Sequence, residues 1–566
     1  MIASATALGS RERLWLFALA ACIGAIALWP LARLVWEAVA PRGGGFDLSV
    51  AERALSSPAT WRAAWRTLET SVLGTAISLI LGLGFALAVA LTDIRAKAAL
   101  VFLFVLPLVV PSQIAALAWI NMAGPQSALL GAVGLAPPPG SPNPMLGREG
   151  IAWLLGLEHA PFVFLAVRAG LRALPREAID AARGCGADRT TVARTIVLPL
   201  MLPAILAGAL LAFVSSVGNF GTPALMGIPV GYNTLVTLIY QRLAGFGPSV
   251  LAQAATLSAL IGLFALVVLR LHARLRKATD ARLASGLPPE PWRLGKARLP
   301  LEIFLWVALI LVSVVPFVAL LAQALVPAIG VTLTAETFTL RAFAEAFAQD
   351  AVDRAFANSF LLAGTAAMLC VTVALPLAYF VAWRRSRLVR AIDALVELPY
   401  ALPGIVLAIA MILVFIKPIP LVGVSIYGTL WIVGIAYVAR FLVLALRPVG
   451  AAFAQLDPAL DEAAAAAGAR LGRRLRDVAL PMVAPAAGAG AILVFLTALN
   501  ELTVSALLWS SGAETLGVIV FSLQEGGDSP LAAAVSSLAV AVVVALMASL
   551  SLLAKRLPKG TLPWAD

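Results

Sequence analysis

Apolar stretches of about 20 residues recur along this chain, and a helix that crosses the hydrocarbon core of a bilayer needs about that length. The chain is 61% hydrophobic and 12% charged, whereas soluble domains carry about 25% charged residues. We therefore predict an all-α polytopic membrane protein with twelve transmembrane helices. The twelve candidate spans are residues 13–38, 68–92, 99–122, 150–172, 200–224, 250–271, 300–327, 357–383, 391–416, 425–447, 482–508 and 530–553.

The basic residues are distributed unevenly over the connections between these spans. If the N-terminus lies in the cytoplasm, roughly three quarters of the 41 Lys and Arg residues fall in cytoplasmic connections, as the positive-inside rule requires. Both termini are then expected in the cytoplasm. This distribution also accounts for the net charge of +12, because the positive charge lies in connections that face the cytoplasm. We therefore expect the lipid bilayer as a partner and do not expect nucleic acid.

The two halves of the chain repeat the same landmarks in the same order. Residues 106–119 (LPLVVPSQIAALAW) align with 398–411 (LPYALPGIVLAIAM), and Asn219 aligns with Asn500. Because each half has six predicted spans, both copies enter the membrane in the same direction, as parallel repeats related by an axis along the membrane normal. The predicted domains are two six-helix units and a polar cytoplasmic linker between them, at residues 1–272, 300–566 and 273–299.

One polar segment recurs between the fourth and fifth predicted spans of each half. Its copies read DAARGCGADRTTVARTIVLP at 180–199 and EAAAAAGARLGRRLRDVALP at 462–481. In each copy strong helix formers precede a glycine, the residue that adopts a left-handed helix stop at least cost. We expect a cytoplasmic helix–turn–helix over about 175–199 and 458–481 that presents small and charged side chains to a partner. The alternative is an amphipathic helix that merely lies on lipid headgroups.

The pattern acid-Ala-Ala, three residues, Gly, nine residues, Ile or Val, one residue, Leu-Pro resembles the EAA signature of binding-protein-dependent ABC importer permeases. The resemblance covers essentially the whole chain, which looks like two permease units of the type I, methionine-importer-like fold fused head to tail. Residues 500–534 look most like the ferric-iron branch of these permeases. Importers of thiamine, phosphonate, sugar phosphate or polyamine are the alternatives. The resemblance implies a multi-pass protein of the bacterial inner membrane.

By this resemblance, 175–199 and 458–481 are coupling segments that insert into a cytoplasmic ABC ATPase, expected to be a homodimer. A periplasmic or lipid-anchored solute-binding protein is the second implied partner. The chain contains no GxxxxGK[ST] phosphate loop. We therefore expect no cofactor on this chain and no enzymatic activity, with ATP and Mg held by the ATPase. The residues implied in coupling are Asp180, Ala181, Ala182, Gly186, Ile196, Leu198, Pro199, Glu462, Ala463, Ala464, Gly468, Val478, Leu480 and Pro481.

Polar and ionisable side chains inside predicted spans are costly in a bilayer, so they are functional candidates by default. An interhelical hydrogen bond is the alternative role for each, and for Glu397 it is the preferred interpretation. No metal site is expected, because one carboxylate beside an asparagine cannot form the cage of several oxygens that a hard cation needs. The candidates for a translocation pathway are Ser215, Ser216, Asn219, Glu397, Asn500 and Glu501.

Two other classes of protein are weighed against the importer. A gradient-driven secondary transporter also commonly has two parallel six-helix halves, but its expected basic signature between spans two and three is reduced here to TDIRAK at 92–97. A membrane enzyme would have Glu158 and His159 as its best acid–base pair, although a pair at a helix end is more often structural. No HExxH motif or nucleophile constellation supports an enzyme.

Overall fold

The computed structural model describes residues 10–41, 45–172, 174–245, 247, 249–278, 290–384, 386–418 and 423–553. Within these ranges the chain is helical, and the β-structure recorded there is one isolated bridge between Thr92 and Trp292. Ten described helices are long and apolar enough to cross a membrane, and three further pairs of helices pass the same test but are bent. The buried apolar side chains form one extensive core.

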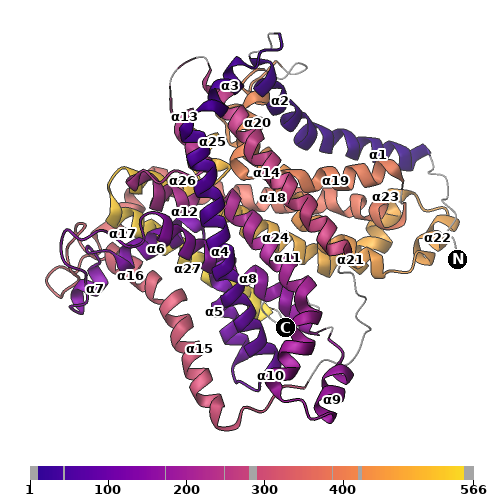
Figure 1. The fold of residues 1–566 in the computed structure, drawn as a ribbon. Helices are drawn as coiled ribbons and strands as arrows, with labels where there is room; N and C mark the ends of the chain where they lie inside the picture. The colour runs from indigo at the N-terminus through magenta and orange to yellow at the C-terminus, as the bar shows by residue number, and fades with distance from the viewer. Residues whose placement is uncertain are drawn as a thin grey trace.

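The helices of the two halves follow one another in matching order, apart from the short helix α7 in the first half (Figure 1). The first half contains α1 (Ser10–Ile23), α2 (Trp29–Val39), α3 (Ser49–Ser56), α4 (Pro58–Leu91), α5 (Lys97–Val109), α6 (Ser112–Ala123), α7 (Ala128–Ala132), α8 (Arg148–Arg172), α9 (Arg176–Gly184), α10 (Arg189–Val192), α11 (Leu198–Gly218), α12 (Gly221–Gly227), α13 (Leu235–Leu243) and α14 (Val250–Ala278). The second half contains α15 (Arg298–Ser313), α16 (Val315–Ala324), α17 (Arg341–Ala348), α18 (Asp350–Trp383), α19 (Arg387–Ala401), α20 (Gly404–Phe415), α21 (Leu430–Gln455), α22 (Ala459–Ala466), α23 (Leu471–Arg474), α24 (Leu480–Leu499), α25 (Ser505–Leu508), α26 (Leu516–Glu525) and α27 (Ser529–Leu553).

Two of the twelve predicted spans are bent where we expected straight helices. The span at 99–122 bends by 105° between α5 and α6, and the span at 391–416 bends by 108° between α19 and α20. Pro111 and Pro403 stand at these two bends, and the residue before each proline has an extended backbone. The proline ring clashes with the preceding residue in a helical conformation, which explains why the helix ends there. The other ten predicted spans correspond to the ten long helices.

Two of these long helices end earlier than predicted. The span predicted at 200–224 ends as a helix at Gly218, and the span predicted at 482–508 ends at Leu499. In the first half the chain then turns into a short bent pair, in which α12 and α13 are inclined by 75°. Hydropathy did not reveal these ends, because apolar residues resume within a few positions of each end.

One hydrogen bond occurs at aligned positions of both halves. Thr67 of α4 accepts the amide of Leu235 through its hydroxyl oxygen at 2.8 Å. Ser359 of α18 accepts the amide of Leu516 in the same way, also at 2.8 Å. In each half the hydroxyl therefore satisfies the first amide of the helix that follows the short turn, an amide with no partner inside its own helix.

The first helix of each half packs on the opposite half. Helix α1 lies along α18 and α19 of the second half, at the side of the molecule where α22 is also found (Figure 1). Helix α15 lies beside α5 of the first half. The two halves are thus interleaved through their first helices, and this interleaving brings distant charged residues together.

Candidate functional site

A cavity of about 390 Å³ lies between the two halves of the chain. Helices α5, α8 and α11 line it from the first half, and α19, α21 and α24 line it from the second. Small-molecule sites commonly have volumes of about 300–1,000 Å³, so a small solute fits. The lining residues with polar side chains are Ser112, Glu158, His159, Ser215, Asn219, Tyr400, Thr497, Asn500 and Glu501.

The bend between α5 and α6 forms part of the cavity wall. The final carbonyls of a helix have no partner within the helix, so a bend inside the molecule needs other donors. Asn500 of the second half supplies one, because its Nδ2 donates to the carbonyl of Val109 at 2.5 Å. The same amide donates to the carbonyl of Leu496 at 2.9 Å. A side chain of one half therefore stabilises the bent span of the other.

Four of the six predicted pathway residues line this cavity: Ser215, Asn219, Asn500 and Glu501. Ser216 lies behind the wall and hydrogen-bonds to the lining residue His159. Glu397 lies outside the lining. Its side chain is 56% exposed and pairs with Arg447, as the alternative interpretation of an interhelical contact expects.

Glu158 and His159, which the sequence led us to regard as structural, both face the cavity. The Glu158 carboxylate accepts a hydrogen bond from Asn219 Nδ2 at 3.1 Å and one from the Thr222 hydroxyl at 3.3 Å. The Nδ1 atom of His159 lies 2.9 Å from the Ser216 hydroxyl. The usable signal in the sequence was a Glu-His pair in the middle of an apolar run, where ionisable residues are functional candidates.

Asn219 also ends α11 and starts the next helix. Its side-chain oxygen accepts the amide of Thr222 at 3.1 Å, while its amide group binds Glu158. In the second half Glu501, which directly follows the aligned Asn500, accepts the amide of Val504 through Oε1 at 2.9 Å. Both side chains thus satisfy an amide at the start of a short helix, and both are held in place at the cavity wall.

Glu501 has a cationic partner. Its Oε2 lies 3.6 Å from Nε of Arg440, and the two side chains are 8% and 14% exposed. The Tyr437 hydroxyl donates to the backbone carbonyl of Glu501 at 3.2 Å. No salt bridge involves Glu158 among the described residues, and neither Lys nor Arg occurs among the residues that line the cavity. The lining therefore carries an excess of negative charge when Glu158 is ionised.

Three aromatic rings from both halves pack together next to the cavity. The ring centroid of Phe220 lies 5.1 Å from that of Tyr240 and 5.7 Å from that of Phe521. Phe220 directly follows the lining residue Asn219, and Phe521 belongs to α26 of the second half.

The described part of the chain offers no groups of three or more His, Cys, Asp or Glu that could hold a metal ion.

The first coupling segment folds as a helix, a glycine turn and a second short helix that continues through a π-helical turn into α11. Gly186 has a φ of +84°, a conformation that residues with a Cβ adopt only with strain. Asp188 accepts the amide of Thr191 at 3.0 Å and so caps α10. Hydrogen bonds from Thr191 hold the pKa of Asp188 below its usual value. Asp180 and Ala181 are exposed and Ala182 is half-buried beside this turn.

The second coupling segment has the same course through α22, α23 and a π-helical turn into α24. Gly468 has a φ of +80° at the turn. Glu462 and Ala463 are exposed and Ala464 is half-buried. The expected helix–turn–helix geometry is therefore present in both halves, with the acid, the alanines and the glycine accessible. The other six residues implied in coupling lie at the start of the following spans, either half-buried or exposed: Ile196, Leu198, Pro199, Val478, Leu480 and Pro481.

Comparison with known families decides the class of protein. The family described as "Binding-protein-dependent transport system inner membrane component" matches residues 78–278 and again residues 374–562. The chain belongs to this family. It carries the family's unit twice, so the prediction of a fused two-unit importer permease is confirmed. Members of this family are multi-span permease subunits of the inner membrane, and the chain is a transporter subunit rather than an enzyme.

Among the relatives of this permease is the probable ABC transporter permease protein y4fN of Sinorhizobium fredii. It is 30% identical over 512 residues, which cover 89% of this chain and 88% of the relative. The Fe(3+)-transport system permease protein FbpB 2 of Haemophilus influenzae is 26% identical, over 76% of this chain and 77% of the relative. The ferric transport system permease protein FbpB of Actinobacillus pleuropneumoniae is 27% identical, over 75% of this chain and 61% of the relative.

A solved structure with detectable similarity is an inward-facing form of the MetNI methionine ABC transporter. It is 23% identical, covers 40% of this chain and 99% of its own chain, and has a TM-score of 0.31.

Proposed function

We propose that this permease forms the membrane path of an ATP-driven importer of ferric iron. In this proposal a binding protein delivers the solute, and a homodimeric ATPase carries ATP and Mg on the cytoplasmic side. The chain crosses the membrane twelve times as two parallel repeats, with both termini in the cytoplasm. The observation that carries the proposal is the cavity between the halves, because it contains four of the six residues expected to line a path.

The cavity charge supports a cationic solute. Two carboxylates and one imidazole line the cavity, with no Lys or Arg among the described lining residues. Arg440 offsets the charge of Glu501, so Glu158 is the carboxylate available to attract a cation. When Glu158 is ionised, phosphonates and sugar phosphates would meet repulsion at this surface, since a desolvated site strengthens interactions between like charges. Ferric iron, thiamine and polyamines fit the charge, and the ferric relatives favour iron.

The cavity is suited to passing a cation and not to retaining it. A retained hard cation takes several oxygen ligands at once, and the described residues provide no such cluster. A transport path instead requires contacts that admit the ion and are weak enough to release it. Glu158, held by Asn219 and Thr222, offers a single carboxylate of this kind.

Alternating access is the mechanism that we infer. ATP binding would close the ATPase dimer and move both coupling segments, so that the halves rock about the axis between them and open the cavity outward. The aromatic contact of Phe220 and Phe521 joins the two halves beside the cavity, and we assign it as a barrier that must separate in that state. Hydrolysis would return the halves to their first arrangement.

The test is uptake by the purified complex in proteoliposomes, with the permease, its ATPase and its binding protein. We expect uptake of ferric iron that requires ATP hydrolysis and is not driven by an ion gradient alone. Uptake of a phosphonate in preference to iron would overturn the substrate assignment. Uptake without any ATPase subunit would overturn the proposed machine and favour a secondary transporter.

A further inference from the structure

The second coupling segment contains a buried ion pair that its counterpart in the first half lacks. Asp461 of α22 and Arg474 of α23 lie 3.1 Å apart (Oδ2 to Nη1), and their side chains are 5% and 7% exposed. The aligned positions of the first coupling segment are Ile179 and Val192, which are also buried. The same two positions are therefore apolar in the first half and ionic in the second.

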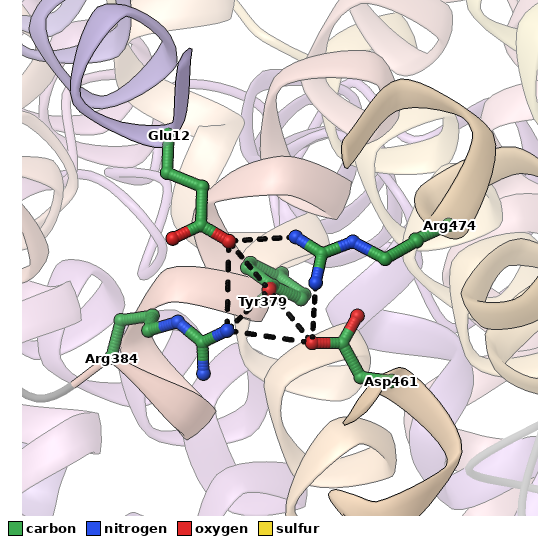
Figure 2. Close-up of polar contacts among 5 residues, drawn as sticks. All are labelled: Glu12, Tyr379, Arg384, Asp461 and Arg474. Carbon is green, nitrogen blue, oxygen red and sulfur yellow. Dashed lines mark hydrogen bonds and ion pairs between the residues drawn. The ribbon is translucent and has the colours of Figure 1, made fainter. Parts of the chain in front are cut away.

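Three further side chains complete the cluster around this pair (Figure 2). Glu12 of α1 approaches Arg474 at 2.6 Å (Oε1 to Nη2). Arg384, which follows α18, lies 3.5 Å from the carboxylates of both Glu12 and Asp461. The Tyr379 hydroxyl donates to Asp461 at 2.9 Å. Figure 2 shows the two carboxylates and the two guanidinium groups arranged in alternation around the Tyr379 hydroxyl.

The cluster is balanced in charge, and the loss of a single charged member would unbalance it. Two carboxylates face two guanidinium groups, and the side chains of Glu12 and Arg384 are 13% and 18% exposed. Removing one partner from such a buried group leaves an uncompensated charge away from water, which is strongly unfavourable. Both guanidinium groups also lie near the Tyr379 ring, at 5.5 and 5.8 Å from its centroid. Each member therefore fixes the position of the others.

Glu12 is the member that comes from the opposite half. It belongs to α1, which crosses over to pack on α18 and α19 (Figure 1). The cluster thus fastens the second coupling segment to the first helix of the first half. The other four members belong to the second half, so the link between the halves depends on the crossover of α1.

The first coupling segment also touches residues just ahead of the opposite half, but through exposed groups. Arg176 of α9 pairs with Glu290 at 2.8 Å, and these side chains are 36% and 66% exposed. Arg189 donates to the carbonyl of Arg293 at 2.8 Å. Residues 290–293 precede α15, the first helix of the second half. Exposed pairs of this kind contribute little and are screened by salt, so the cross-half contact is firm at one coupling segment and loose at the other.

We propose that Glu12 is a positioning residue that ties the second coupling segment to the first half, so that force applied at this segment reaches both halves together. The proposal rests on the proposed function to the extent that a partner ATPase supplies the force. The tie itself is a property of this chain alone and can be measured without transport.

The first measurement is amide hydrogen exchange on the full chain in lipid nanodiscs, without partners. Glu12→Gln should accelerate amide exchange over 459–474 by about tenfold or more. Local opening of this segment would then no longer require the Glu12–Arg474 contact to break. Exchange over 176–192 should stay unchanged. Glu290→Gln is the matched control, since it removes the exposed cross-half pair, and it should leave 459–474 unchanged. Equal exchange over 459–474 in the two variants would overturn the proposal.

A double variant separates the tie from charge balance. Glu12→Gln with Arg384→Gln removes one acid and one base and leaves the Asp461–Arg474 pair. The unfolding temperature should return toward that of the wild type, while exchange over 459–474 stays fast. Recovery of slow exchange would show that charge balance suffices, which would overturn the role of Glu12. This double variant also guards against a simple folding defect in the single variant.

The second measurement uses the complex with the ATPase and the loaded binding protein. Glu12→Gln should still copurify with the ATPase, but stimulation of ATP hydrolysis by the binding protein should fall at least about fivefold relative to Glu290→Gln. Equal stimulation in both variants would overturn the mechanical part of the proposal. A wild-type complex that shows no stimulation would overturn the proposed function instead, and hydrogen exchange would still test the tie independently.

Discussion

Asn219 and Asn500 occupy aligned positions in the two halves and line the same cavity, but their side-chain amides bind different partners. Asn219 donates to the Glu158 carboxylate at 3.1 Å, whereas Asn500 donates to the carbonyl of Val109 at 2.5 Å. If the alignment of the two coupling segments, 180–199 with 462–481, is extended toward the N-terminus, Glu158 aligns with Arg440. The repeated framework therefore carries a carboxylate in one half and a guanidinium group in the other.

The Glu158 carboxylate should determine the charge preference of the path. Glu158→Gln keeps the size of the side chain but removes its charge, so we expect iron uptake to fall on the order of tenfold, equivalent to ~1.4 kcal/mol. The measurement is initial uptake by the reconstituted complex at saturating ATP. Glu397→Gln is the control, because Glu397 lies outside the cavity lining. Equal uptake by the two variants would contradict the role of Glu158.

The turn of the second coupling segment requires glycine at one position. Gly468 has a φ of +80° and no neighbour within 4 Å of an added Cβ, so Gly468→Ala costs about 1–2 kcal/mol through backbone strain alone. We expect loss of transport and uncoupled ATP hydrolysis with normal membrane insertion. Gly472→Ala is the matched control. An added Cβ at Gly472 also has no neighbour within 4 Å, but Gly472 lies in helix α23. Coupled transport by Gly468→Ala would argue against the assignment of this segment.

The pair of Arg440 and Glu501 should be needed for stability as a unit. Arg440→Met leaves Glu501 buried without its cationic partner, which should cost roughly 3–5 kcal/mol. The double variant Arg440→Met with Glu501→Gln should recover much of this loss, because no buried charge is then unpaired. Thermal unfolding of the purified chain in detergent measures both. A double variant no more stable than the single one would show that the pair does not act as a unit.

The close approach of α12 to α6 should make Gly221 intolerant of a side chain. A Cβ at Gly221 would collide with the Ser112 hydroxyl and would lie 2.9 Å from the amide of Gln113. Gly221→Ala should therefore lower the free energy of unfolding by about 1–3 kcal/mol. Gly84→Ala provides the comparison, because an added Cβ there has no neighbour within 4 Å. The prediction is wrong if both variants unfold at the same temperature.

Local sequence patterns were sufficient for most of the spans and for the helix–turn–helix course of 175–199 and 458–481. Length and apolarity identify a membrane-crossing helix because the bilayer imposes one thickness on all of them. Ten of the twelve predicted spans correspond to long helices, with α1 and α2 counted as one and α15 and α16 as another. The bends at Pro111 and Pro403 were also readable in principle, since proline acts on its immediate neighbour. The ends at Gly218 and Leu499 were not read from hydropathy, because apolar residues resume soon after Asn219 and after Asn500 and Glu501.

The sequence by itself thus determined the membrane class, the doubled unit and the two glycine turns, all of which depend on residues close together in the chain. Tertiary packing alone decided which polar side chains meet. It placed Glu158 beside Asn219, put Glu397 outside the cavity, and brought Glu12 to Arg474 across nearly the whole chain. The physical reason is that a polar residue in an apolar helix needs a partner wherever it lies, and which partner it meets depends on how the helices cross.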